Sequence, residues 1–299
     1  GRKIEDALHF SHPIENISYQ AYGLSKGDRD EHGTPGQYPL LRGNSKPSND
    51  WVNNVAIPRG SAEAINKAAL HHLMNGATGL RIDLGNLDVE SCKKALKDIQ
   101  FEYISATLIF HTDEQVNWLI DEFSEKDYDL TLEGNHDISI ETVRSRTIQA
   151  WEVQATGGNV SQEIAWALHQ GHSAFFNLLK SGKSIPTANK MLKFRFGIGG
   201  NYFFEIAKFR AFRALWSTII TEYNTEQKGL PAPYIEAQTG FVNKSLSDPH
   251  TNLLRQTTEA VSAILGGVDE LTILPYNWYA QNREIDKTQR LATNIGLLL

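Results

Sequence analysis

The sequence predicts an α/β protein in which alternating strands and helices close into a (β/α)8 TIM-type barrel with an extended N-terminal arm. Two observations lead to this fold. Strand-like and helix-like segments alternate eight times from residue 51 onward, and eight such units over about 250 residues have the size of a closed β/α barrel. Strands separated by helices also pair in parallel through right-handed crossovers. An open doubly wound sheet is the alternative fold.

The bulk composition narrows the class of protein. No Pro/Gly/Ser-rich linker divides residues 51–299, so we expect one barrel domain after an arm formed by residues 1–50. A net charge of -6 gives no general attraction to nucleic acid or anionic membranes, and no apolar run is long enough to span a bilayer. The single cysteine, Cys92, cannot form an internal disulfide. We therefore expect a cytoplasmic protein without a nucleic-acid or membrane partner.

The first 50 residues lack a clean hydrophobic period and are rich in Gly, Pro, Asn and Asp. Turns are predicted at Thr34-Pro35-Gly36 and at Lys46-Pro47-Ser48. An extended arm of this length is expected to lie on a surface.

The first four units begin with apolar, β-branched strands and continue into helices with a 3.6-residue period. Ser61 is expected to cap the first helix, and Asn75-Gly76 to end it. The predicted strands are 51–57, 79–84, 103–110 and 128–133, and the predicted helices are 62–75, 89–99, 113–123 and a short 139–144.

The last four units follow the same order, and Gly266-Gly267 marks the end of their third helix. The predicted strands are 147–153, 192–198, 234–239 and 270–276. The predicted helices are 160–179, 202–223, 251–265 and a tail from residue 283.

Polar residues on several strands share one parity. In Leu80-Arg81-Ile82-Asp83-Leu84 the two charged residues alternate with three apolar ones. Since helices cover the outside of a barrel, the polar set must face the axis. The predicted interior polar cluster is Arg81, Asp83, Glu133, Glu152, Lys193, Arg195, Glu236 and Gln238. Its charges nearly balance, as they must, because an unpaired buried charge costs several kcal/mol. Either interlocking salt bridges or a polar active site at the strand ends would explain this cluster.

Three weaker patterns point to other kinds of site. Gly197-Ile198-Gly199-Gly200 precedes a helix and could hold a phosphate, but a dinucleotide fingerprint needs glycine where Tyr202 stands, so a tight turn is favoured. His169 and His172, like His9 and His12, have no third ligand at a diagnostic spacing, so no metal site is predicted. Glu133 and Glu236 are an acid pair that a glycoside-hydrolysing barrel could use.

Several motifs keep their order across residues 35 to 267 and together resemble the substrate barrel of the methylmalonyl-CoA mutase family, the adenosylcobalamin-dependent acyl-CoA mutases. They are Pro35-Gly36, Tyr38-Pro39, Arg42-Gly43, Gly60-Ser61-Ala62-Glu63, Gly76-Ala77-Thr78-Gly79-Leu80, Phe203-Phe204-Glu205-Ile206-Ala207-Lys208-Phe209-Arg210-Ala211, Leu215-Trp216, Gln238-Thr239-Gly240, Ser245-Leu246, Asp248-Pro249 and Ala263-Ile264-Leu265-Gly266-Gly267.

The resemblance implies a barrel whose acyl-CoA substrate threads along the axis, with cobalamin on a separate domain. The cobalt-ligand motif of that domain, Asp-x-His-x-x-Gly, is not in this sequence, so adenosylcobalamin is expected on a partner subunit and no cofactor on this chain. Where the family has Gly-Tyr-His on strand five, with the histidine contacting the thioester, this chain has Ala150-Trp151-Glu152. Small family residues on strand two are replaced by Arg81 and Asp83. We therefore predict no catalytic residue here.

These departures look like the small, non-catalytic subunit of a heterodimeric methylmalonyl-CoA mutase. The resemblance implies that such a complex interconverts methylmalonyl-CoA and succinyl-CoA, and that this chain stabilises the large catalytic subunit through its arm and exposed aromatic residues. The alternative is an active acyl-CoA mutase barrel with an altered substrate and the cobalamin domain on another chain.

Overall fold

A computed structural model describes residues 9–13, 15–20, 33–44, 50–134, 138, 140–223, 230–278 and 285–299. Its main sheet has eight strands in the order β6-β5-β4-β3-β10-β9-β8-β7, and all seven neighbouring pairs are parallel. The strands are β3 (Val52–Ile57), β4 (Gly79–Asp83), β5 (Ser105–Ile109), β6 (Leu130–Glu133), β7 (Arg146–Gln149), β8 (Leu192–Ile198), β9 (Tyr234–Thr239) and β10 (Glu270–Thr272).

The two end strands of this sheet meet and close it. A parallel bridge joins Thr131 of β6 to Arg144, immediately before β7. The amide of Leu132 donates to the carbonyl of Arg144 at 2.8 Å, and the amide of Arg144 donates to the carbonyl of Leu130 at 3.0 Å. An open doubly wound sheet leaves its end strands apart, so the prediction of a (β/α)8 barrel is confirmed.

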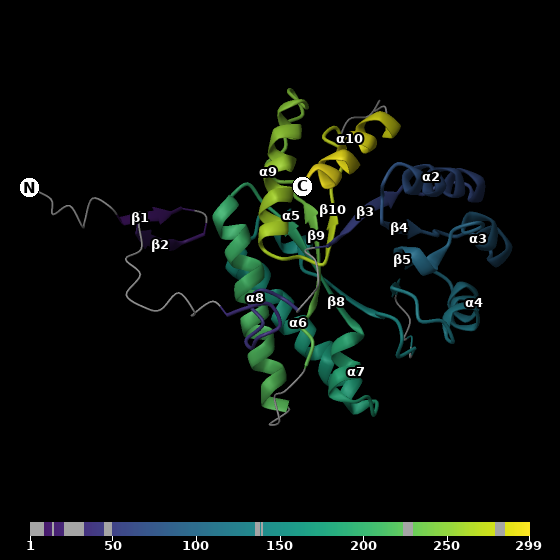
Figure 1. Ribbon diagram of the computed structural model, residues 1–299, viewed down its shortest axis with the longest axis horizontal. Coiled ribbons are helices and arrows are strands. Elements are labelled where there is room, and N and C mark those ends of the chain that lie inside the picture. The colour runs from purple at the N-terminus through teal and green to yellow at the C-terminus, as the bar shows by residue number, and fades with distance from the viewer. Residues whose placement is uncertain are drawn as a thin grey trace, which may run out of the picture.

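Helices surround the strands, with α2, α3 and α4 on one side and α6, α7 and α8 on the other (Figure 1). Ser61 caps the first barrel helix as predicted, since its side chain accepts from the amide of Ala64. The helices are α2 (Ala62–Met74), α3 (Val89–Ala95), the 3-10 turn η2 (Phe101–Tyr103), α4 (Asp113–Phe123), α5 (Trp151–Ala155), α6 (Val160–Lys180), α7 (Ile185–Lys190), α8 (Tyr202–Tyr223), α9 (Thr251–Leu265) and α10 (Ile285–Leu298).

The connection between β6 and β7 differs from the prediction. The described part of 139–144 forms a turn and the closing bridge rather than a helix, while Ser139 lies outside the described residues. Ile138, Ile140 and Val143 are buried there. The segment fills the side of the barrel with apolar side chains, so no helix is needed to cover it.

The apolar core lies between strands and helices rather than on the axis. Two buried clusters form it, one from the first half of the chain and one from the second. Leu80 and Ile82 of β4 belong to the first, and Phe194 and Phe196 of β8 to the second. The apolar residues of each strand therefore face outward, and the polar residues that alternate with them face the interior.

The described part of the arm lies on the barrel. β1 (His9–His12) and β2 (Ile17–Gln20) form an antiparallel hairpin. In its turn the carboxylate of Glu15 accepts from the amide of Val160, at the start of α6, at 2.8 Å. Tyr19 packs edge-on against Phe204 of α8. The predicted turn at 46–48 lies outside the described residues, and the division into an arm and a barrel at residue 50 stays a prediction.

None of the described helices is long and apolar enough to cross a membrane.

Candidate functional site

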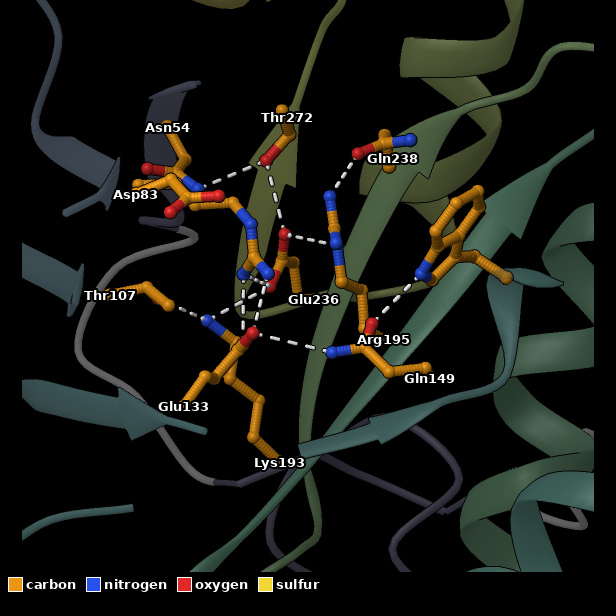
Figure 2. Close-up of polar contacts among 12 residues, drawn as sticks. Asn54, Asp83, Thr107, Glu133, Gln149, Lys193, Arg195, Glu236, Gln238 and Thr272 are labelled. Carbon is orange, nitrogen blue, oxygen red and sulfur yellow. Dashed lines mark hydrogen bonds and ion pairs between the residues drawn. The ribbon is translucent and has the colours of Figure 1, made fainter. Parts of the chain in front are cut away.

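Glu236, on β9, lies at the centre of the barrel and is fully buried. Its carboxylate lies 2.9 Å from Lys193 Nζ, 2.9 Å from Arg195 Nε and 3.9 Å from Arg81 Nη1. The hydroxyl of Thr272 also donates to it at 3.2 Å. Figure 2 shows these groups from several strands converging on Glu236. One carboxylate thus joins three cations.

Glu133, at the end of β6, pairs with Arg81 of β4, two strands away in the sheet. The guanidinium donates to both carboxylate oxygens, at 2.8 Å and 2.5 Å, a two-point contact of fixed orientation. Gln149 of β7 donates to Glu133 at 3.3 Å (Figure 2). Because Gln149 and Glu133 come from the two strands at the closing seam, this contact also joins the seam through side chains.

Lys193 connects Glu236 to polar groups nearer the N-terminal ends of the strands. Its ammonium donates to Thr107 at 3.0 Å and to Glu270 at 2.6 Å, in addition to its contact with Glu236. Tyr234 donates to Glu270 at 3.4 Å. With three partners, Lys193 has its hydrogen-bonding capacity filled although it is wholly buried.

The layer at the strand N-terminal ends is built on Arg144. Its guanidinium pairs with Asp129, donates to Thr131 at 3.1 Å and stacks 3.9 Å from the centre of the Tyr234 ring. At the opposite end, Arg195 donates to Gln238 and lies 5.5 Å from the ring centre of Trp151. The indole of Trp151 donates to Gln149 at 2.8 Å. Aromatic rings therefore close the polar interior at both ends.

Charges in the interior balance. Four cations, Arg81, Arg144, Lys193 and Arg195, stand against four carboxylates, Asp129, Glu133, Glu236 and Glu270. This equality is what a buried cluster requires, since each uncompensated ion costs several kcal/mol after relaxation.

The pKa values follow from these contacts. Burial opposes ionisation of Glu236, but Lys193, Arg195 and Arg81 outweigh it and hold its pKa far below the ordinary value. Burial likewise opposes ionisation of Glu133, and Arg81 reverses this and lowers its pKa. At Glu270 burial prevails over Lys193, with help from Glu236, and the pKa is raised. A strongly ionised pair does not suit glycoside hydrolysis, in which one acid must hold a proton.

Six of the eight predicted interior residues are brought together here: Arg81, Glu133, Lys193, Arg195, Glu236 and Gln238. Asp83 stands at the rim instead. Its carboxylate pairs with Arg59 Nε at 2.7 Å and with His111 Nε2 at 2.8 Å, so it belongs to a cluster at the C-terminal ends of β4 and β5.

The prediction was wrong for Glu152, which is exposed on α5. Strand β7 ends at Gln149, so the strand parity assumed for residues 150–154 does not apply. Glycines explain why a helix fits here. A Cβ at Gly197 would lie 2.6 Å from Gln154 Oε1, and one at Gly240 would lie 2.5 Å from Gln154 Nε2. Because neither glycine has a Cβ, α5 can lie over the ends of β8 and β9.

Glu270, Arg144 and Asp129 were missed. For Glu270 a signal existed, because Glu270 and Thr272 alternate with Leu271 at the start of a predicted strand. For Asp129 a signal existed too, because it lies in the predicted strand 128–133 and alternates with Leu130 in step with Thr131 and Glu133. Arg144 lies in the segment predicted as a helix, so strand parity gave no information about it.

The glycine-rich turn after β8 does not hold a phosphate. The amide of Gly197 donates to the carboxylate of Glu163 at 2.7 Å, and a Cβ at Gly199 would lie 2.9 Å from Glu205 Oε1. Two carboxylates therefore stand where an anion would have to bind. Of the histidine pairs, His172 contacts the hydroxyl of Tyr223 at 2.7 Å, and among the described residues no group of three His, Cys, Asp or Glu is arranged to hold a metal ion.

Comparison with known proteins gives consistent matches. The family model of methylmalonyl-CoA mutase matches residues 137–299. The methylmalonyl-CoA mutase small subunit of Porphyromonas gingivalis is 39% identical over 157 residues, covering 52% of this chain and 25% of that protein. That of Propionibacterium freudenreichii subsp. shermanii is 24% identical over 342 residues, covering 100% of this chain and 53% of that protein. The methylmalonyl-CoA mutase of Rhizobium meliloti is 33% identical over 155 residues, covering 52% of this chain and 22% of that protein. The chain thus spans about half of these relatives or less.

Proposed function

Because this chain belongs to the methylmalonyl-CoA mutase family, we propose that it is the small, catalytically silent subunit of a heterodimeric mutase. In this proposal a large partner subunit carries adenosylcobalamin and the reaction, and this chain stabilises it in the cytoplasm. The observation that carries the proposal is the barrel axis filled by the chain's own ion pairs around Glu236.

The first support for the proposal is that the chain's own side chains occupy the barrel axis. An acyl-CoA threaded along the axis would have to displace Lys193 from Glu236 and Glu270, contacts of 2.9 Å and 2.6 Å between fully buried groups. It would also have to separate Arg81 from both oxygens of Glu133. Breaking such pairs leaves buried charges uncompensated, at a cost of about 3–5 kcal/mol each.

The electrostatics of the barrel mouth are a second support. A pocket of about 540 Å³ at the strand N-terminal ends is lined by five carboxylates, and none of its described lining residues is lysine or arginine. The phosphates of coenzyme A would be repelled by such a surface. The carboxylates are Asp50, Glu102, Asp127, Asp129 and Asp269.

The opposite end of the barrel offers little to a cofactor. Trp151 covers Arg195 and donates to Gln149, and Asp83 holds both Arg59 and His111. These side chains pair with one another, and we propose that the cofactor is held by the partner subunit.

The hairpin and nearby exposed rings are the proposed contact with the partner. Phe10 of β1 is 47% exposed and Phe203 of α8 is 77% exposed. Large aromatic side chains are enriched in protein interfaces.

The test is purification of the tagged chain from its native source. We expect a larger chain with the absorption spectrum of cobalamin to co-purify at equal stoichiometry, and mutase activity to be absent from this chain alone. Recovery of the chain without a cobalamin-binding partner would contradict the proposal. Acyl-CoA mutase activity that depends on this chain's own residues would favour the alternative of an active barrel with an altered substrate.

A further inference from the structure

A pocket of about 530 Å³ lies between the N-terminal hairpin and the C-terminal ends of the barrel strands. His12, Glu15 and Tyr19 line it from the hairpin, and Gly199, Gly200 and Val242 from the barrel. This volume is within the range of small-molecule sites. The pocket is separate from the ion pairs on the axis.

The pocket reaches two buried carboxylates that share a single cation. Glu163 is 1% exposed and Glu205 is 3% exposed, and both line the pocket. Lys208 Nζ lies 2.8 Å from Glu163 Oε2 and 2.6 Å from Glu205 Oε2. It also donates to the carbonyl of Gly197 at 2.5 Å. One ammonium thus faces two carboxylates, which leaves an excess of negative charge.

The charged groups that line the pocket are acidic. Glu15 adds a third carboxylate, and none of the described lining residues is lysine or arginine. Burial, opposed by Lys208 and assisted by Glu205, raises the pKa of Glu163 to about 7, in keeping with incomplete compensation.

We propose that this pocket binds a small organic cation, an ammonium compound that donates to Glu205 while its apolar body rests against Tyr19 and Val242. An ammonium group brings hydrogen-bond donors and a positive charge, which complement these acidic side chains. Phosphates and carboxylates are disfavoured by the three acidic side chains. The proposal does not depend on the role of the chain as a subunit.

The test is NMR titration of the full chain with three ligands of one shape and different charge: tyramine, the neutral 4-(2-hydroxyethyl)phenol, and 4-hydroxyphenylacetate. We expect tyramine to bind roughly tenfold to a hundredfold more tightly than the neutral compound, since a charge-assisted hydrogen bond replaces a neutral one. The anion should bind most weakly. Equal affinity for all three ligands, or no binding of tyramine at millimolar concentration, would overturn the proposal.

A matched pair of variants locates the site. Glu205→Gln keeps the side-chain shape and leaves Lys208 paired with Glu163, and it should weaken tyramine at least roughly tenfold. Glu222→Gln, on the exposed side of the same helix, should leave tyramine binding unchanged. Unchanged binding in Glu205→Gln also contradicts the proposal. If that variant does not fold, the charge series on the unaltered chain decides.

Discussion

Lys193 Nζ lies 2.9 Å from Glu236 Oε2, and both side chains are completely excluded from solvent. Neither ion would be stable there alone, because moving a single charge out of water costs more than any one contact returns. Arg195 and Arg81 approach the same carboxylate. Glu236 therefore holds the interior together, and substitutions around it give the sharpest tests.

Replacing Glu236 with glutamine should strongly destabilise the fold. The change leaves Lys193 and Arg195 without their shared counter-ion, and we expect the free energy of unfolding to fall by about 3–5 kcal/mol. Urea denaturation followed by circular dichroism measures it. The control is Glu90→Gln, which removes the exposed pair with Lys93 (2.7 Å) and should cost less than about 1 kcal/mol. Similar losses in both variants would refute this role of Glu236.

Acid should destabilise the barrel through Glu133 and Glu236. Burial opposes the ionisation of both carboxyl groups, but the neighbouring cations outweigh it, so both pKa values are lowered in the folded chain. The resulting stabilisation is present above the unfolded-state pKa of about 4.3 and is lost as pH falls below it. Urea midpoints measured from about pH 6 down to about pH 3 should fall less steeply for Glu236→Gln than for the unaltered chain. Parallel curves would show that Glu236 is not linked to acid unfolding.

Glu163 should give the opposite pH dependence. Burial raises its pKa from 4.5 to about 7, so the folded chain binds a proton that the unfolded chain has released. Its contribution to stability therefore decreases as pH rises from about 4.5 to about 7. Glu163→Gln should remove this decrease, on the order of 1–3 kcal/mol. The measurement is the difference in unfolding free energy between the two chains at several pH values, and a constant difference contradicts the assignment.

Gly197→Ala should be costly because the site has no room for a side chain. The added Cβ would lie 2.6 Å from Gln154 Oε1 and 3.1 Å from Gln154 Cβ, so the whole Gln154 side chain would have to move. We expect a loss of about 1–3 kcal/mol in unfolding free energy. Gly60→Ala is the matched control, since its Cβ meets only Ala64 Cβ, at 3.4 Å. Equal thermal midpoints for the two variants would be inconsistent with tight packing at Gly197.

The regular elements with a clear hydrophobic period could be predicted from the sequence. Helices α4, α8 and α9 and strands β8 and β9 have the predicted bounds, because cap residues and glycines mark their ends. Parity then placed Lys193, Arg195 and Glu236 on the axis, since each alternates with apolar residues that the helices cover.

The errors come from segments where local pattern and tertiary packing disagree. Residues 151–155 alternate polar and apolar side chains like a strand, yet they form α5 because Gly197 and Gly240 leave space above the neighbouring strands. Glu270 balances the charge of Lys193 through a 2.6 Å contact. The two residues are 77 positions apart in the sequence. The alternation of Glu270 and Thr272 with Leu271 could have placed Glu270 in the interior, but its partner follows only from the closed barrel.

The most direct test of the central claim, that the chain's own ion pairs fill the barrel axis, is calorimetry of the purified chain with methylmalonyl-CoA and with succinyl-CoA. We predict no specific binding of either compound up to millimolar concentration, because entry would separate Arg81 from Glu133 and Lys193 from Glu236. Binding of either compound at one equivalent per chain with a dissociation constant below about 1 mM would contradict the claim.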